Sequence, residues 1–470
     1  MMKTNGAKKI FTVGTLTYTT SGVIALFCWM LWGDFAWIMK GRSVGALAAV
    51  MVKKFGISNY LYGLLIVSIP NFTNIFLIPW ISYKSDRHRG RFGRRIPYLF
   101  MTTPIVTIAL IGLGLSPWLG TLLKAQAIFA KFDVNTLRLC VFAFFWLLLD
   151  LGTTLSVNIF SALINDVVPK ILLGRFFAMT RAVSLLAAVL FNAKLLGKAE
   201  DYGPELLIGI GILYGIGLST LCLMVKEGDY PPPPAEEAGR QNPISNTVKI
   251  VKSYWQLCFT LPYYRVLFLG MTLVGLGTLP FNTYYIFFAK SMEVSMDALG
   301  KCQATCFAVS FVLCFFLGAL SDKFHPLRTS MVALAICVLV DLCGGIFCTS
   351  VNSFLVIQLI HGIAVMSFNT LFASCAARLF PQLYFAQFNS IAALLSSAST
   401  MLLVPLLGKL LDLSGQRYVL VYIIGAVIQF CGLVALFFVY RGFLRYGGDE
   451  AYQAPLPDGV ASQESQTTPA

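Results

Sequence analysis

The chain consists mainly of long apolar runs that alternate with short polar and charged connections. A membrane-spanning helix needs about 20 mostly apolar residues. By that measure we predict an all-α membrane protein with twelve spanning helices, at residues 16–40, 58–82, 97–116, 137–163, 175–197, 204–225, 263–289, 299–320, 330–350, 353–377, 389–411 and 418–440.

The chain changes character between the sixth and seventh predicted helices. Residues 226–243 (KEGDYPPPPAEEAGRQNP) contain four consecutive prolines, which favour an extended spacer. Residues 245–260 mix lysines with tryptophan and apolar side chains, a pattern typical of a helix lying on the inner membrane surface. We therefore predict an N-terminal six-helix half (1–225), a cytoplasmic linker with an interfacial helix (226–262), a C-terminal six-helix half (263–446) and a disordered cytoplasmic tail (447–470).

Composition agrees with a membrane protein. Hydrophobic residues make up 57% of the chain and charged residues 12%, and the mean hydropathy is +0.76. The net charge of +14 lies on connecting loops and helix ends, without the aromatic-basic pattern of single-strand binding, so we expect no nucleic-acid partner. The first ten residues show no cleavage site, and the distribution of Lys and Arg predicts both termini on the cytoplasmic side of the cytoplasmic (inner) membrane.

One connection is unusually basic. Ser85–Pro97 reads SDRHRGRFGRRIP and follows the second predicted helix, as expected for a cytoplasmic loop. A weaker version, Ser321-Asp322-Lys323, ends the eighth predicted helix. Each loop could serve only to anchor the topology, but two similar loops in two halves favour an internally repeated transporter.

A charge inside a spanning helix costs roughly 2.5–3.5 kcal/mol on insertion scales, which makes such residues informative. Asp34 lies in the first predicted helix, one turn from Trp37. A carboxylate beside an indole suits a sugar, because hydroxyls bind strong acceptors and the apolar sugar face packs on the ring. The alternative is an internal salt bridge from Asp34 to Lys40 or Arg42.

The fourth predicted helix carries a polar stripe. Asp150, Thr154, Asn158 and Ser161 fall within about 80° of one another on one helix face. In a bilayer that face must meet a cavity or another helix. Asp150 lies near mid-span, where a carboxyl group is a candidate for loading and releasing a proton; the alternative is a stripe that only joins helices.

Two more sets of residues are candidates for a central site. Arg181, in the fifth predicted helix, could neutralise Asp150 or bind cargo oxygens, or it could pair with Asp166. The seventh predicted helix presents a polar-aromatic stripe, which consists of Gly275, Thr278, Asn282 and Tyr285.

The remaining chemistry-bearing residues suggest neither a metal site nor an enzyme. The twelve cysteines lie almost entirely in apolar runs without zinc or disulfide spacing. A structural imidazole is favoured over a proton relay for His361, and the pattern gives no account of the mid-span Asp341. We find no metal-ligand cluster, nucleophile motif or phosphate loop in the sequence, so we expect no catalytic activity, no metal and no cofactor.

These residues resemble a known family. The whole chain is similar to the major facilitator superfamily, and within it to the glycoside-pentoside-hexuronide cation symporters and the related sucrose-proton symporters. Arg91-Phe92-Gly93-Arg94-Arg95 with Pro97 is similar to the R-x-G-R-R-x-P loop of the sucrose symporters. Phe145-Trp146 running to Asp150, then Ala162-Leu163 and Asp166, resembles their fourth helix, whose aspartate is the proposed proton site. Gly33-Asp34-Phe35-Ala36 resembles the melibiose permease segment whose aspartate binds sugar.

Two positions depart from the relatives. Asn74 and Ile78 stand where melibiose permeases carry an acid pair for sodium, which favours a proton as the coupling ion over sodium. Ser161 stands where sucrose symporters carry an arginine, so their Asp-Arg pair is missing unless Arg181 replaces it.

The resemblance and the residues together predict a monomeric secondary transporter that carries a sugar or glycoside through the bilayer by alternating access, as a proton symporter. The alternatives are another small solute, such as an organic anion attracted by Lys40, Arg42 and Arg181, or a membrane sensor that does not transport. The predicted cargo site consists of Asp34, Trp37, Asn158, Arg181, Thr278, Asn282 and Tyr285, with Asp150 as the proton site. The predicted cytoplasmic gate, expected to hold the outward-open state, consists of Asp86, Arg87, Arg91, Arg94, Arg95, Asp166, Arg175, Asp322 and Lys323.

Overall fold

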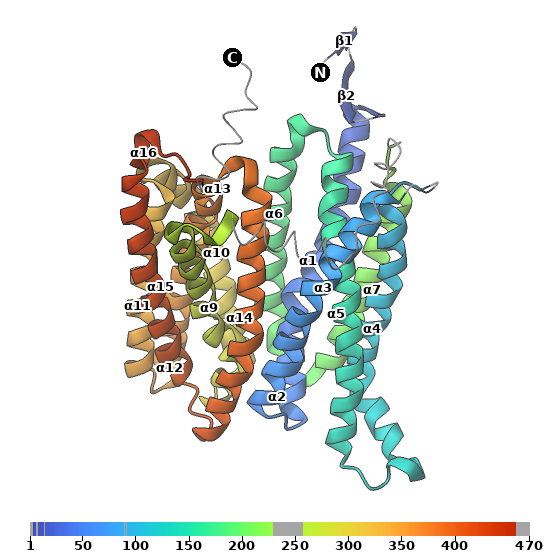
Figure 1. Ribbon diagram of the computed structural model, residues 1–470. Helices are drawn as coiled ribbons and strands as arrows, with labels where there is room; N and C mark the ends of the chain where they lie inside the picture. The colour runs from blue at the N-terminus through green and yellow to red at the C-terminus, as the bar shows by residue number, and fades with distance from the viewer. Residues whose placement is uncertain are drawn as a thin grey trace, which may run out of the picture. The chain divides into compact units, whose positions relative to one another are not determined.

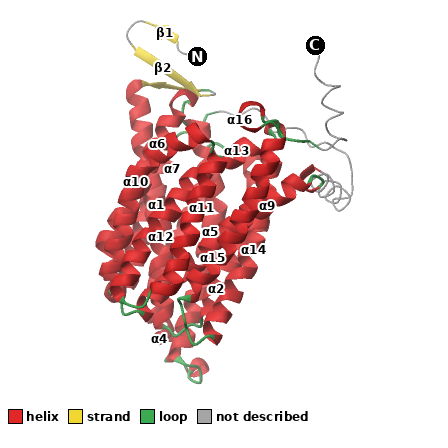
Figure 2. Cartoon of the chain, turned by 90° about the vertical axis from the view of Figure 1, so that its left-hand side faces the viewer, coloured by secondary structure: helices red, strands yellow, loops and turns green. Residues whose placement is uncertain are grey.

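The computed structural model describes residues 3–5, 8–13, 15–88, 90, 92–228 and 257–456. Almost all of this part of the chain is helical, apart from short strands at the N-terminal end (Figures 1 and 2). Ten segments of it are long and apolar enough to cross a membrane. The all-α membrane fold is therefore confirmed.

The helix count differs from twelve for two local reasons. One of the ten segments, Lys170–Met224, is 55 residues long and contains both the fifth and the sixth predicted helices. The second predicted helix corresponds to α2, a π-helical turn and α3. This stretch is not one of the ten candidate membrane-spanning segments. Twelve spans thus remain a prediction.

The chain divides into two compact units. The first comprises Met1–Ala235 with Val294–Phe307, and the second comprises Glu236–Glu293 with Ala308–Ala470. The helices of the first unit are α1 (Thr20–Lys54), α2 (Asn59–Gly63), α3 (Ile69–Arg87), α4 (Ile96–Lys124), α5 (Val134–Val167), α6 (Leu173–Leu190) and α7 (Ala199–Met224). Single π or 3-10 turns join or flank them at Leu64–Ser68, Ala127–Phe129, Lys170–Leu172, Phe191–Leu195 and Leu196–Lys198.

Within the first unit, α4 packs on α5 and α7, and α1 packs on α6 and α7. Three antiparallel strands precede α1: β1 (Lys3–Asn5), β2 (Lys8–Val13) and β3 (Leu16–Thr19). The side chain of Thr19 accepts a hydrogen bond from the Gly22 backbone N–H, so this residue ends β3 and caps α1. The first predicted helix consequently begins four residues later than position 16.

The second unit holds the remaining helices, with α10 shared between the units. They are α9 (Pro262–Ser291), α10 (Met296–Phe324), α11 (Pro326–Phe347), α12 (Val351–Phe372), α13 (Cys375–Leu379), α14 (Phe385–Leu413), α15 (Leu420–Arg445) and α16 (Gly448–Ala451), with a 3-10 turn at Gln382–Tyr384. Here α15 packs on α9 and α11, α11 packs on α12, and α14 packs on α9. Pro262 and Pro326 stand in the first turns of α9 and α11, where the missing N–H costs nothing.

The units are divided in the proline-rich linker, between Ala235 and Glu236, and again inside α10, after Phe307. Gly300 in the first half of α10 packs against the backbone carbonyl of Asn192, which leaves no room for a Cβ. A Cβ on Gly197 would lie 3.1 Å from Asp297 of the same half-helix. The first half of α10 therefore belongs to the first unit, although the sequence predicted it in the C-terminal half.

The predicted linker and tail are described in part. Residues 229–256, which include most of the predicted interfacial helix, and residues 457–470 lie outside the described part of the chain. The rest of the tail packs on the second unit, since Tyr452 Oη donates to the Leu379 carbonyl at 2.9 Å and Tyr264 Oη donates to the Pro455 carbonyl at 2.9 Å. Residues 447–456 were predicted to be disordered. Instead, hydrogen bonds of two tyrosine hydroxyls hold this segment against the second unit.

Candidate functional site

A cavity of about 220 Å³ opens inside the first unit. Residues of α1, the π-helical turn at Leu64–Ser68, α3 and α5 line it: Lys40, Gly41, Val44, Gly45, Ile66, Pro70, Trp146, Leu149, Asp150 and Thr153. It brings a carboxylate, an ammonium group, an indole and a hydroxyl together among apolar side chains. That mixture is typical of a small-molecule site, in which a few polar groups orient a ligand.

Lys40 provides the positive charge of this cavity. Its side chain is buried, and Nζ donates to Thr153 Oγ1 at 3.1 Å. The same ammonium lies 3.9 Å from the ring centre of Trp37 and 5.1 Å from that of Tyr214. Aromatic faces thus stabilise a cation that has no carboxylate partner among the described contacts.

Trp37 does not line the cavity itself. Its ring stacks on Phe160 with centroids 5.6 Å apart, and the Lys40 ammonium lies over the same ring. The structure therefore places Trp37 as a support for Lys40. The indole that reaches the cavity is that of Trp146, whose buried Nε1 has no hydrogen-bond partner in the described structure. Sequence reasoning noted Trp146 only for its resemblance to the sucrose symporters.

Asp34 is buried, with 6% of its surface exposed, and its Oδ2 has no hydrogen-bond partner among the described residues. Lys40 binds Thr153, and Arg42 Nη2 donates to Ser184 Oγ at 3.1 Å. The alternative of an internal salt bridge from Asp34 to either cation is therefore wrong. A carboxylate oxygen left unpaired at this depth is costly, and it is available to a ligand or a proton.

The polar stripe of α5 turns toward α3. Asp150 Oδ2 accepts a hydrogen bond from Thr73 Oγ1 at 2.6 Å, and Thr154 Oγ1 donates to Asn74 Oδ1 at 2.5 Å. Asp150 also lines the cavity, so the stripe both joins two helices and reaches a void. The buried Nδ2 of Asn158 has no partner in the described part of the chain.

Ser161, at the other end of the stripe, does not line the cavity. Ser161 is exposed and donates to the carbonyl of Val157 at 3.1 Å. Arg181 and Arg175 are exposed on α6, and Arg181 is near enough to Arg42 for the two like charges to interact. Among the described hydrogen bonds and ion pairs, Arg181 contacts neither Asp150 nor Asp166.

Asp166 is instead the centre of a basic cluster. Its carboxylate accepts two hydrogen bonds from Arg94, at 2.6 and 3.0 Å, and one from Arg95 Nε at 3.3 Å. Arg95 Nη1 donates in turn to Ser85 Oγ at 2.7 Å. The cluster thus ties the end of α5 to the loop before α4. The side chains of Asp86 and Arg87, and Arg91 as a whole, lie outside the described structure.

Glu227 completes this cluster and was missed by sequence reasoning. Its carboxylate accepts three backbone N–H bonds at the start of α4, from Arg94, Arg95 and Ile96, at 2.9, 2.8 and 2.6 Å. Gly93 permits the approach, because its φ is +95° and a Cβ there would lie 2.6 Å from Glu227 atoms. The only signal in the sequence was an acid placed just after α7, at the start of the predicted linker.

The predicted residues of the second unit lie apart from one another. Thr278 and Tyr285 are half-buried and Asn282 is exposed, all on α9, and Thr278 Oγ1 donates to the Gly275 carbonyl at 3.1 Å. Asp322 accepts from Arg378 Nη2 at 3.0 Å in an exposed ion pair, which is worth little on its own. Lys323 lies over the ring of Phe324, with 5.2 Å from Nζ to the ring centre.

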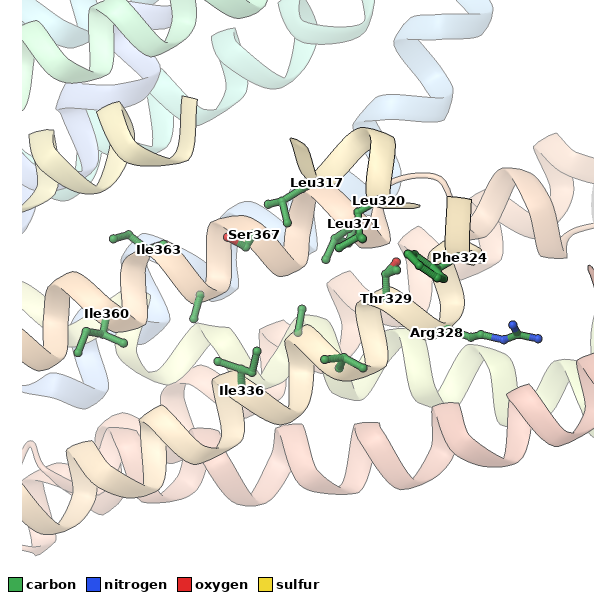
Figure 3. Close-up of a pocket in the computed structure, with 13 residues that line it drawn as sticks. Leu317, Leu320, Phe324, Arg328, Thr329, Ile336, Ile360, Ile363, Ser367 and Leu371 are labelled. Atoms are coloured by element: carbon green, nitrogen blue, oxygen red, sulfur yellow. The ribbon is translucent and has the colours of Figure 1, made fainter. Parts of the chain in front are cut away.

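A larger groove of about 690 Å³ also lies in the second unit, between α10, α11 and α12 (Figure 3). Leucine, isoleucine and valine side chains form most of its wall, and Arg328 stands at one end. That arginine is already engaged, because Nε donates to Tyr440 Oη at 2.9 Å and Nη2 pairs with Asp449 at 2.7 Å. The groove offers few groups that could bind hydroxyls.

Comparisons with known proteins agree with one another at the level of the fold. The sequence model of the Major Facilitator Superfamily matches residues 35–343 and 267–453. Among curated proteins no match is found. Among solved structures, a bacterial homolog of the human lysosomal transporter Spinster, inward-facing and unoccupied, aligns with a TM-score of 0.62 and 15% identity, over 91% of this chain and 98% of that one.

Two further structures align similarly. A bacterial homologue of the iron transporter ferroportin, inward-facing, has a TM-score of 0.62 and 14% identity over 89% of this chain and 98% of that one. A D-xylose-proton symporter has a TM-score of 0.60 and 14% identity over 89% of this chain and 96% of that one. At such identities the likeness establishes the fold alone.

Proposed function

Because the chain belongs to the Major Facilitator Superfamily, a family of membrane transporters, we propose that it carries a sugar or glycoside across the cytoplasmic membrane together with a proton. Transport proceeds by alternating access, with both termini in the cytoplasm. One neighbour in fold is a D-xylose-proton symporter, which supports this cargo class, whereas others carry the names of nucleoside and iron transporters.

The observation that carries the proposal is the composition of the first unit's cavity. Asp150 and Lys40 both line it, yet the described ion pairs do not join them. A hydroxyl group can donate to the carboxylate and accept from the ammonium, so a polyhydroxyl cargo can bridge two opposite charges that do not pair directly. The unpaired Nε1–H of Trp146 supplies a further donor, and its ring an apolar surface.

Asp150 is the proposed proton site. Thr73 binds one carboxylate oxygen, at 2.6 Å, which leaves the other oxygen for a proton or for a cargo hydroxyl. Protonation changes the charge of the cavity by one unit, and the low polarity of the surrounding wall makes that change energetically important. Cargo affinity and proton occupancy are linked in this way.

Reconstitution into proteoliposomes tests both parts of the proposal. We expect uptake driven by an inward proton gradient and competition by sugars or glycosides. Asp150→Asn should abolish accumulation while cargo exchange persists, and Glu205→Gln, which changes an exposed acid on α7, should leave both intact. Unchanged accumulation in Asp150→Asn would remove the proton role. Ligand-induced thermal stabilisation without any counterflow would instead indicate a sensor.

A second cargo class is favoured by one observation, namely the buried Lys40 ammonium without a described carboxylate partner. A buried cation stabilised only by aromatic rings and a hydroxyl suits an organic anion. Competition by carboxylates and not by sugars would select this alternative, and Lys40→Gln would then abolish binding.

A further inference from the structure

Three polar side chains converge in the buried interior of the second unit. Asp341 from α11 and His361 from α12 are each 1% exposed, and Gln429 from α15 is fully buried. His361 Nδ1 lies 2.5 Å from Asp341 Oδ1, and Gln429 Nε2 donates to Asp341 Oδ2 at 2.9 Å. We propose that this cluster binds and releases a proton at a site distinct from Asp150.

The surroundings isolate the cluster from water. The ring of Phe281 lies 4.5 Å from the imidazole, centre to centre, and the ring of Tyr422 lies 5.7 Å away. The other titratable groups nearby are Cys337, whose thiol interacts electrostatically with Asp341, and Tyr285, whose ring contacts Phe281. Among the described contacts, His361 is the one basic side chain that pairs with Asp341.

Charge counting shows why a proton matters here. The short Nδ1···Oδ1 contact requires one proton between the two groups. With that proton alone, the pair carries one net negative charge, which the neutral amide of Gln429 stabilises only through its hydrogen bond to Asp341. A second proton makes the pair neutral, and an isolated charge in a dry interior costs several kcal/mol. The second proton can therefore leave only when the site becomes hydrated.

Two atoms of the cluster argue against a purely structural role. Both His361 Nε2 and Gln429 Oε1 are buried without a hydrogen-bond partner in the described part of the chain. A cluster that only joined helices would lose about 1–3 kcal/mol for each such atom. Nε2 is the atom at which the second proton would bind or leave.

Helix α9 supplies a gate. Pro280 inside α9 has no N–H, so one backbone hydrogen bond of the helix is missing beside Phe281. One turn away, the Gly277 carbonyl accepts from Gln429 Nε2 at 3.3 Å, and Gly277 has no room for a Cβ against that glutamine. Bending of α9 at this point would move the Phe281 ring and open His361 to water.

The same helix carries Thr278, Asn282 and Tyr285, the predicted cargo residues of this unit. Asn282 directly follows Phe281 and is exposed. Cargo that contacts Asn282 would therefore shift the gate of the proton site. This link to cargo rests on the proposed function, whereas proton binding at the cluster does not.

Infrared difference spectroscopy between acidic and alkaline pH, on purified full-length protein without cargo, tests the site directly. We expect the wild type to show the signals of a buried carboxyl and of imidazoles, Asp341→Asn to lose the buried-carboxyl signal of this site, and His361→Gln to lose the part of the imidazole signal that His88 and His325 do not supply. Asp322→Asn, which changes an exposed carboxylate of the same unit, should remove only an exposed-carboxylate signal. Spectra of Asp341→Asn or His361→Gln that equal the wild type would overturn the proposal.

Two further variants keep the test decisive if substitution of Asp341 prevents folding. Phe281→Ala leaves the pair intact and should speed solvent exchange of the His361 ring protons at least tenfold; an unchanged rate would contradict the gate. Asp150→Asn should keep the cluster's spectrum even though it loses proton-driven accumulation. Failure of the proposed function and failure of this inference are therefore distinguishable.

Discussion

Among possible substitutions, removal of the Glu227 carboxylate is the one whose effect on the free energy of unfolding the structure defines best. Three backbone N–H groups at the start of α4, at residues 94, 95 and 96, bind this side chain at 2.6–2.9 Å. These groups have no partner within a helix, so the carboxylate both satisfies them and lies at the positive end of the helix dipole. It also links the end of α7 to the beginning of α4.

The expected loss of stability in Glu227→Ala follows from these contacts. A hydrogen bond to a charged group contributes about 1.5–3 kcal/mol, but three donors share two oxygens and the half-buried site admits some water. We expect Glu227→Ala to lower the free energy of unfolding by about 2–3 kcal/mol, near the upper limit for helix caps. Glu227→Gln retains an acceptor and should cost about 1 kcal/mol.

Thermal unfolding in detergent, followed by tryptophan fluorescence, measures the effect. A unit of this size shifts its Tm by roughly 2–4 °C per kcal/mol, so Glu227→Ala should melt about 4–12 °C lower. Glu205→Ala provides the matched control, because it removes an exposed carboxylate from α7 without a described hydrogen bond. Equal melting temperatures for the two variants would refute the capping role.

Four further variants test other contacts. Asp34→Asn should weaken cargo binding while it changes Tm little, and an unaltered Kd would exclude Asp34 from the site. Lys40→Gln should lower the affinity for cargo at least tenfold, as measured by thermal shift. Burial lowers the pKa of His325, against the opposing charge of Asp449, and its Nδ1 accepts the Leu327 N–H at 3.2 Å as the cap of α11. Stability should therefore be full above the ordinary histidine pKa of about 6.5 and fall as the pH drops below it, and His325→Asn should abolish that dependence. Tyr452→Phe should make the C-terminal segment more sensitive to protease, and cleavage at the wild-type rate would contradict its anchoring role.

Sequence reasoning predicted features that depend on residues close together along one helix. The stripe on α5 follows from helical spacing, and the basic loop before α4 from local charge, so Asp150, Arg94 and Asp166 could be singled out. Their partners could not be predicted. Thr73 and Glu227 lie 77 and more than 130 residues away from the groups they bind, and only packing brings them together.

Packing also adds contacts within the first unit that the sequence did not indicate. Trp37, which was predicted to stack on cargo, lies under Lys40, and Trp146 lines the cavity. Asp341 and His361 lie 20 residues apart on separate helices, and spacing alone gave no reason to pair them. Amphipathic patterns identify which side of a helix is polar, but they do not identify the helix that it faces.

The course of α10 has a practical consequence for dissection of this protein. A cut in the proline-rich segment would leave residues 294–307 on the C-terminal fragment, although they pack with the N-terminal one. A separately produced fragment ending near residue 235 would lack the surface that covers Asn192 and Gly197. Co-production of both fragments would restore that surface, so complementation in the cell should succeed where either piece alone aggregates.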